Sequence, residues 1–204
     1  MGLLDIFRRA PPIRDAQALA DFIDRNAAFV VQKGIYEYSR ARAGHYAKVL
    51  FREPEFQAAA ERSRWRAYPL GLALVAELVE GVLRPAAGKD RQTQAAALNA
   101  LVMSVFDRYP PPAAIGELGW SEQRAELARR LQLIGLHPAK LAMDIPEQFA
   151  ESYFEMMPIH EKLRGRDFPT IRNYLRVTMV NIHGKLTERL DSAAVAHSLR
   201  DGST

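Results

Sequence analysis

Two groups of polar side chains have the types and spacing of a ligand-binding site. The first lies in YEYSRARAGHYAK (36–48) and comprises Tyr38, Arg42, His45 and Tyr46. At helical spacing Arg42 shares a side with Tyr38 and Tyr46, so a guanidinium stands beside hydroxyl groups that can hydrogen-bond a ligand. This pattern is typical of a site for an anion or a polar headgroup. A carboxylate from another helix would satisfy Arg42 equally well, because a cation among apolar neighbours needs a partner.

The second group lies along one edge of the last long amphipathic segment. Arg172, Arg176 and His183 flank an apolar face there. Arginines in such a strip can bind a carboxylate or phosphate through paired N–H groups. They can also pair with the acidic middle of the chain, since residues 71–161 carry net negative charge and both ends carry net positive charge.

Patterns for metal binding and familiar catalysis are missing from the sequence. His160 and Glu161 begin as the zinc motif H-E-x-x-H does, but Arg164 occupies the second histidine position. Three glutamates spaced by four residues are predicted to form a solvated face of their helix: Glu147, Glu151 and Glu155. The chain has no cysteine, no glycine-rich phosphate loop and no G-x-S-x-G elbow. The sequence therefore predicts no catalytic residue, no metal and no cofactor.

The composition is that of an ordinary globular protein. Of 204 residues, 48% are hydrophobic and 25% are charged, and the net charge is +4. Arginines alternate with Trp65 and Tyr68 in ERSRWRAY (61–68), and cations beside aromatic rings are typical of single-strand nucleic-acid binding. Nucleic-acid binding is therefore a third hypothesis, behind protein binding and small-molecule binding.

Apolar residues recur at the helical period along nearly the whole chain, and no strand pattern is found. The expected helices cover 15–33, 35–52, 55–67, 70–83, 91–108, 122–134, 146–157 and 168–190. Gly34 is expected to kink or break a helix and Pro69 to end or kink one. Glu77, Glu80 and Arg84 are expected to form one solvent-facing edge of an otherwise apolar helix. The predicted fold is all-α, an irregular bundle of about seven or eight helices without a sheet.

The predicted organisation is one helical domain with two short terminal segments. The domain spans 13–191, residues 1–12 form a short amphipathic segment, and 192–204 are expected to be a disordered tail. Residues 1–9 are expected to dock on the protein's own body or to touch a membrane or a partner. No stretch reaches the roughly 18 apolar residues of a membrane span, and a cytoplasmic location is expected.

The leading functional hypothesis is a non-enzymatic helical binding protein, an adaptor or assembly factor. The alternative is a helical ligand-binding protein or unfamiliar enzyme, with the two polar groups converging between helices on a small molecule. The first predicts an exposed apolar surface larger than a monomer normally shows. The second predicts a closed pocket in which Arg42 lacks a carboxylate partner. Homodimer formation is compatible with either.

Overall fold

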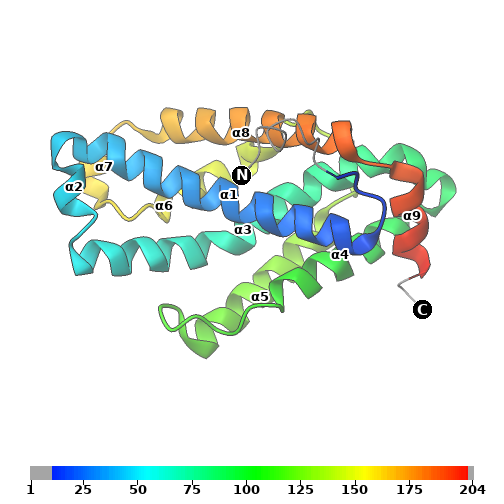
Figure 1. Ribbon diagram of the computed structural model, residues 1–204, viewed down its shortest axis with the longest axis horizontal. Helices are drawn as coiled ribbons and strands as arrows, with labels where there is room; N and C mark the ends of the chain where they lie inside the picture. The colour runs from blue at the N-terminus through cyan, green and yellow to red at the C-terminus, as the bar shows by residue number, and fades with distance from the viewer. Residues whose placement is uncertain (1–10, 202–204) are drawn as a thin grey trace, which may run out of the picture.

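Residues 11–201 are described by the computed structural model, and they form a bundle of long helices (Figure 1). The main helices are α1 (Ala16–Ala43), α3 (Pro54–Ala87), α4 (Arg91–Phe106), α5 (Gly116–Leu133), α8 (Phe168–Arg189) and α9 (Ser192–Asp201). Shorter segments are η2 (Gly44–Tyr46), α2 (Ala47–Leu50), η3 (Gly88–Asp90), η4 (Ile145–Gln148), α6 (Ala150–Glu155) and α7 (Glu161–Arg164). The predicted all-α fold is confirmed, since the described residues contain no strand beyond an isolated bridge between Ile13 and Leu190.

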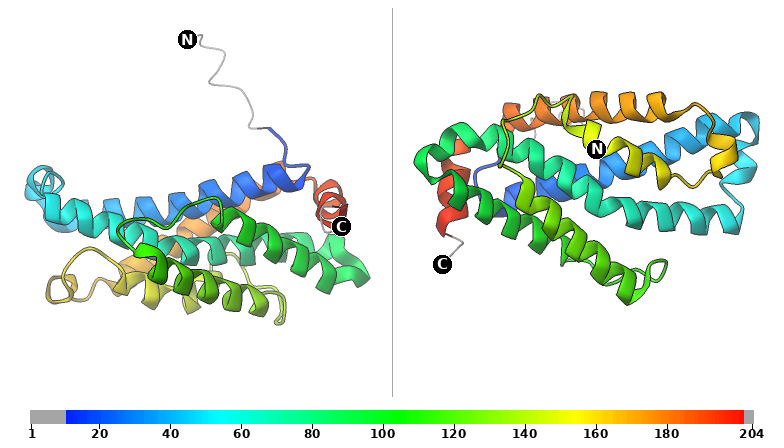
Figure 2. Two further views of the ribbon diagram at one scale, coloured as in Figure 1. Left: turned by 90° about the horizontal axis from the view of Figure 1, so that it is seen from below. Right: turned by 180° about the vertical axis from the view of Figure 1, so that it is seen from behind.

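Helix α3 is the central element. It packs along α1 and also contacts α4, α5, α8 and α9. In Figure 1, α8 runs along the top, α1 and α3 through the middle, and α5 along the bottom. Both views of Figure 2 place α9 across one end of the bundle. Because so many helices meet α3, most of its middle section is excluded from water.

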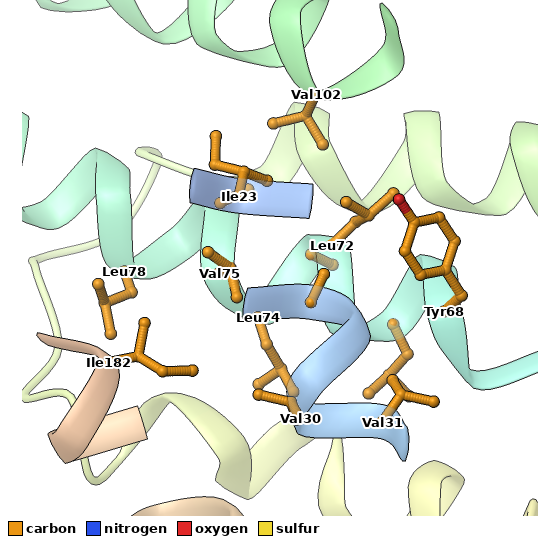
Figure 3. Packing of buried hydrophobic residues seen from close by; sticks show 14 of the residues in the cluster. Ile23, Val30, Val31, Tyr68, Leu72, Leu74, Val75, Leu78, Val102 and Ile182 are labelled. Atoms are coloured by element: carbon orange, nitrogen blue, oxygen red, sulfur yellow. The ribbon is translucent and has the colours of Figure 1, made fainter. Parts of the chain in front are cut away.

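The apolar core lies where α1, α3, α4 and α8 meet. Figure 3 shows Val30 of α1 close to Leu74 of α3, and Leu78 of α3 close to Ile182 of α8. These side chains are at most 2% exposed. Burying a side chain of this size contributes roughly 1.5–3 kcal/mol to folding, so this cluster is the main driving force of the fold.

Helix α1 passes through Gly34 without a break and ends at Gly44. At Gly34 a Cβ atom would lie 2.2 Å from Tyr153 Oη and 2.7 Å from Tyr174 Cε1. The missing side chain therefore lets both tyrosines approach the helix, where each hydroxyl donates to the carbonyl of Val30. Gly44 has a φ of +52°, a conformation that favours glycine, and it ends the helix. The expected break at Gly34 is therefore wrong, and this glycine instead allows close packing.

Helix α3 also continues through Pro69, where the sequence led us to expect an end or a kink. Proline inside a helix removes one backbone hydrogen bond and costs about 3 kcal/mol. The whole stretch from Ala67 to Val79 is buried, however. Packing on both sides of Pro69 offsets the local cost, and the two expected helices 55–67 and 70–83 are one element.

The C-terminal residues 192–201 form α9, so the expectation of a disordered tail is wrong for them. Val195, Ala196 and Leu199 are buried against the bundle. Ser198 accepts a hydrogen bond from the backbone N–H of Ala16 at 3.0 Å. Residues 202–204 and the amphipathic segment expected at the N-terminus, up to residue 10, lie outside the described residues.

Candidate functional site

Two carboxylates on α3 are buried where the sequence predicted a solvent-facing edge. Glu77 is 5% exposed and Glu80 is 4% exposed. The segment 134–148, between α5 and α6, covers them. The prediction of a solvent-facing edge is therefore wrong, because a segment distant in sequence covers these two carboxylates.

Glu77 is held by three polar groups from the covering segment. Its Oε1 lies 2.8 Å from Lys140 Nζ and 3.6 Å from His137 Nε2. Its Oε2 accepts a hydrogen bond of 2.7 Å from Gln148 Nε2. A buried carboxylate is tolerated only with such partners, so these contacts fix the segment against α3.

Glu80 binds the same segment indirectly, through two arginines. Arg84 Nε donates to Glu80 Oε1 at 3.0 Å, and Arg84 Nη1 donates to the carbonyl of His137 at 2.9 Å. Arg91 Nη2 donates to the carbonyl of Gly135, and Arg91 Nε lies 3.9 Å from Glu80 Oε1. Each arginine thus links a carboxylate of α3 to the backbone of the covering segment.

The Lys140–Glu77 contact joins residues that line two hollows. The first is about 360 Å³ in volume, and its lining includes Glu77, Leu133, Leu136, His137 and Phe149. The second is about 460 Å³, and its lining includes Leu78, Lys140, Leu141, Met143, Val180 and His183. Lys140 lines the second hollow and its ammonium contacts Glu77, which lines the first, so a charged pair connects the linings of two largely apolar depressions.

Large apolar side chains are exposed around these hollows. Their exposed fractions are 62% for Leu133, 75% for Leu136, 69% for Leu141, 40% for Met143 and 48% for Val180. We call these five residues the 133–180 surface. Leu133 and Leu136 line the first hollow, and the other three line the second; exposed apolar side chains gathered at hollows mark interaction sites more often than scattered ones do. The hollows and their apolar rims are therefore the candidate functional site.

The first polar group predicted from the sequence lies elsewhere and has an internal partner. Tyr38 Oη donates to Asp167 Oδ2 at 2.8 Å, and Arg42 Nε lies 3.2 Å from the same oxygen. Burial, and next the hydrogen bond to Asp167, raise the pKa of Tyr38 above its ordinary value. His45 and Tyr46 fall in η2 beyond the end of α1 and are exposed. Asp167 is the N-cap residue of α8, but its side chain makes no capping hydrogen bond and contacts Tyr38 and Arg42.

The second predicted group divides between two places. Arg176 Nη1 lies 3.5 Å from Glu147 Oε1, and Arg172 Nη1 lies 3.9 Å from Glu147 Oε2. These pairs join α8 to η4, within the acidic middle of the chain. His183 lines the second hollow. The structure thus brings Tyr38 and Arg42 together, and Arg172 and Arg176 together, but it does not bring the two groups to one pocket.

The aromatic residues of ERSRWRAY pack within the protein. Trp65 makes edge-to-face contacts with Tyr109 at 5.6 Å and with Trp120 at 5.8 Å between ring centroids. Tyr68 is buried and donates to Asp24 Oδ1 at 2.7 Å. Rings engaged in these contacts are poor platforms for stacking a base, so this stretch lends little support to the nucleic-acid hypothesis.

The candidate site was missed in the sequence because its parts are far apart there. Glu77 stands 60 or more positions before His137, Lys140 and Gln148. The available signal was a pair of acids on a helix that is otherwise apolar, together with the leucine-rich segment LIGLHPAKLAMD (133–144). Apolar residues in an irregular segment that also contains Gly and Pro indicate a surface loop that packs against another apolar surface.

Within residues 11–201 there is no group of three or more His, Asp or Glu side chains arranged to hold a metal ion. Over the same residues no helix has the length and apolar character needed to cross a membrane. Comparisons of the chain with protein-family models, with curated proteins and with solved structures found no match. The site is accordingly interpreted from its own geometry.

Proposed function

We propose that this protein is a non-enzymatic helical binding protein, an adaptor or assembly factor, whose docking site for a protein partner is the 133–180 surface. The observation that carries the proposal is the gathering of exposed Leu133, Leu136, Leu141, Met143 and Val180 around two adjoining hollows. Apolar side chains at this exposure contribute little to the stability of the free protein. They would contribute substantially to binding once a partner covers them.

The division between the hollows favours a polypeptide over a lipid chain as the occupant. An acyl chain requires one continuous apolar channel, whereas the linings of the two hollows include the charged Lys140–Glu77 pair. A peptide segment presents separate apolar side chains at regular intervals, and two of them can enter two depressions. The remaining backbone would pass over the polar contact, where it can hydrogen-bond.

The structure lends little support to the small-molecule alternative, which was argued from Arg42 and its neighbours. It required Arg42 to lack a carboxylate partner, and Asp167 provides one at 3.2 Å. Arg172 and Arg176 are likewise close to Glu147. These side chains have structural partners, so they offer no unpaired charge for an anionic headgroup.

The decisive experiment compares two exposed leucines, one inside the site and one outside it. Leu136 is 75% exposed on the site, and Leu118 is 77% exposed on α5 away from it. A photo-crosslinking amino acid placed at each position in living cells would identify the protein bound at 136. Purified, that partner would then be titrated with the unmodified protein, Leu136→Asp and Leu118→Asp.

We expect crosslinks at position 136 that are absent at position 118. Losing one buried leucine contact removes roughly 1.5–3 kcal/mol, so Leu136→Asp should weaken binding by about 10- to 100-fold. Leu118→Asp should leave the affinity unchanged. Equal weakening by both variants, or no protein crosslinked from position 136, would refute the proposal. A small molecule retained in native mass spectrometry would instead support the alternative.

A further inference from the structure

A third hollow, between α3 and α5, carries charges that the fold does not neutralise. It has a volume of about 530 Å³. Arg62 and Arg66 of α3 line one side of it, and α5 contributes Glu122, Gln123, Glu126 and Arg129. In Figure 1, α5 runs below α3 at an angle to it. The hollow is separate from the candidate site described above, and none of its charged residues was assigned a role there.

The two arginines of α3 have no carboxylate partner among residues 11–201. They stand one helical turn apart and are both exposed. Like charges at this spacing repel each other by a few tenths of a kcal/mol. Arg64, between them in sequence, behaves differently, since it lies 3.9 Å from Glu61 and stacks on Trp65 at 5.0 Å. Arg62 and Arg66 are thus two adjacent cations without a counter-ion in the same hollow.

The α5 side of the hollow carries an unpaired charge of the opposite sign. Glu126 is neutralised by Arg129 and by Arg130, whose Nε lies 2.7 Å away. Glu122 makes no ion pair within the described part of the chain. The Oε1 atom of Gln123 is buried and has no hydrogen-bond donor, and such unmet acceptors cost about 1–3 kcal/mol. The hollow therefore holds uncompensated positive charge from α3 and an uncompensated carboxylate from α5.

We propose that this hollow binds a small zwitterion whose charges are separated by a short apolar chain. Its carboxylate would be held by Arg62 and Arg66, and its ammonium group by Glu122. Opposite charges that line one hollow without reaching each other are bridged by a ligand carrying both signs. A simple anion would be attracted by the two arginines but repelled by Glu122. A simple cation would be attracted by Glu122 but repelled by the arginines, so neither would bind as well as a ligand with both charges. The apolar lining by Ile115 and Ala114 suits the connecting chain.

The test uses probes that differ only in charge. Binding to the full chain would be measured by calorimetry for 6-aminohexanoate, hexanoate and hexylammonium at equal ionic strength. Glycine, 4-aminobutanoate and 8-aminooctanoate would vary the distance between the charges. We expect one zwitterion to bind at least about tenfold more tightly than either singly charged analogue.

Variants of the protein would then show which side chains hold the carboxylate of the ligand and which hold its ammonium group. Glu122→Gln should reduce binding of the best zwitterion to that of hexanoate without weakening hexanoate itself. Combining Arg62→Gln with Arg66→Gln should abolish binding of both, while Arg64→Gln should change neither. Arg62, Arg66 and Glu122 are exposed and Arg64 is partly exposed, so circular dichroism should show unchanged folding. The proposal is overturned if no zwitterion of the series saturates the protein, if hexanoate binds as tightly, or if Glu122→Gln has no effect.

Discussion

In the C-terminal half of α3, Glu77 and Glu80 are almost fully buried and surrounded by cationic and hydrogen-bonding partners. In the N-terminal half of the same helix, Arg62 and Arg66 are exposed and lack ion partners among the described residues. The difference follows from what covers each half, since segment 134–148 closes over the first and α5 leaves a hollow beside the second. A buried charge must find its partner inside the protein, whereas a charge at an open hollow remains available to a ligand.

The largest effect expected from this contrast is the loss of Glu80. Glu80→Ala leaves Arg84, whose side chain is 15% exposed, without its carboxylate. Breaking a buried pair in this way should lower the free energy of unfolding by about 3–5 kcal/mol. Urea denaturation would measure the change. Glu188→Ala, an exposed position on α8, is the control and should stay within about 0.5 kcal/mol of the unmodified protein.

The double variant Glu80→Ala/Arg84→Met would sharpen this interpretation. Removing both charges abolishes the uncompensated arginine, so part of the lost stability should return. If the double variant is as unstable as the sum of the two single variants, the two side chains act independently and the pairing argument fails.

A smaller effect is expected at Arg42, which lies between the two extremes. Its side chain is 42% exposed, and that of Asp167 is 25% exposed. Ion pairs open to water contribute about 0.2–1 kcal/mol, and Arg42→Ala should therefore cost no more than roughly 1 kcal/mol. The same urea titration measures it, with Arg40→Ala on the exposed face of α1 as the control. A loss of about 3 kcal/mol would group Arg42 with the buried ion pairs in the C-terminal half of α3 instead.

The smallest effect on stability is expected at Arg62 and Arg66. Replacing either with alanine removes a like-charge neighbour at i,i+4, so the free energy of unfolding should rise slightly or stay within about 0.5 kcal/mol. Thermal and urea denaturation of each variant would check this. A destabilisation above about 1 kcal/mol would show that these arginines have a structural role, and it would contradict their assignment to a ligand.

Individual helical faces were predicted accurately. The apolar face expected along the last long helix is confirmed, since α8 buries Ile171, Leu175, Thr178, Ile182 and Leu186. Leu19, Phe22, Ile23, Ala27 and Val30 are likewise buried in α1. Such faces are predictable because the period of 3.6 residues links sequence spacing directly to direction around the helix. Of the seven site residues predicted from the sequence, only His183 lies at the candidate site.

The sequence by itself determined that the chain is helical, which residues of α1 and α8 face the core, and that no familiar motif for catalysis or metal binding is present. The tertiary structure alone decided that α1 passes Gly34, that α3 passes Pro69, and that Glu77 and Glu80 are covered. Each of these outcomes depends on a neighbour far along the chain: Tyr153 and Tyr174 beside Gly34, and Lys140 and Gln148 over Glu77. Local spacing fixes the direction of a side chain on its own helix, but only packing decides what that side chain meets.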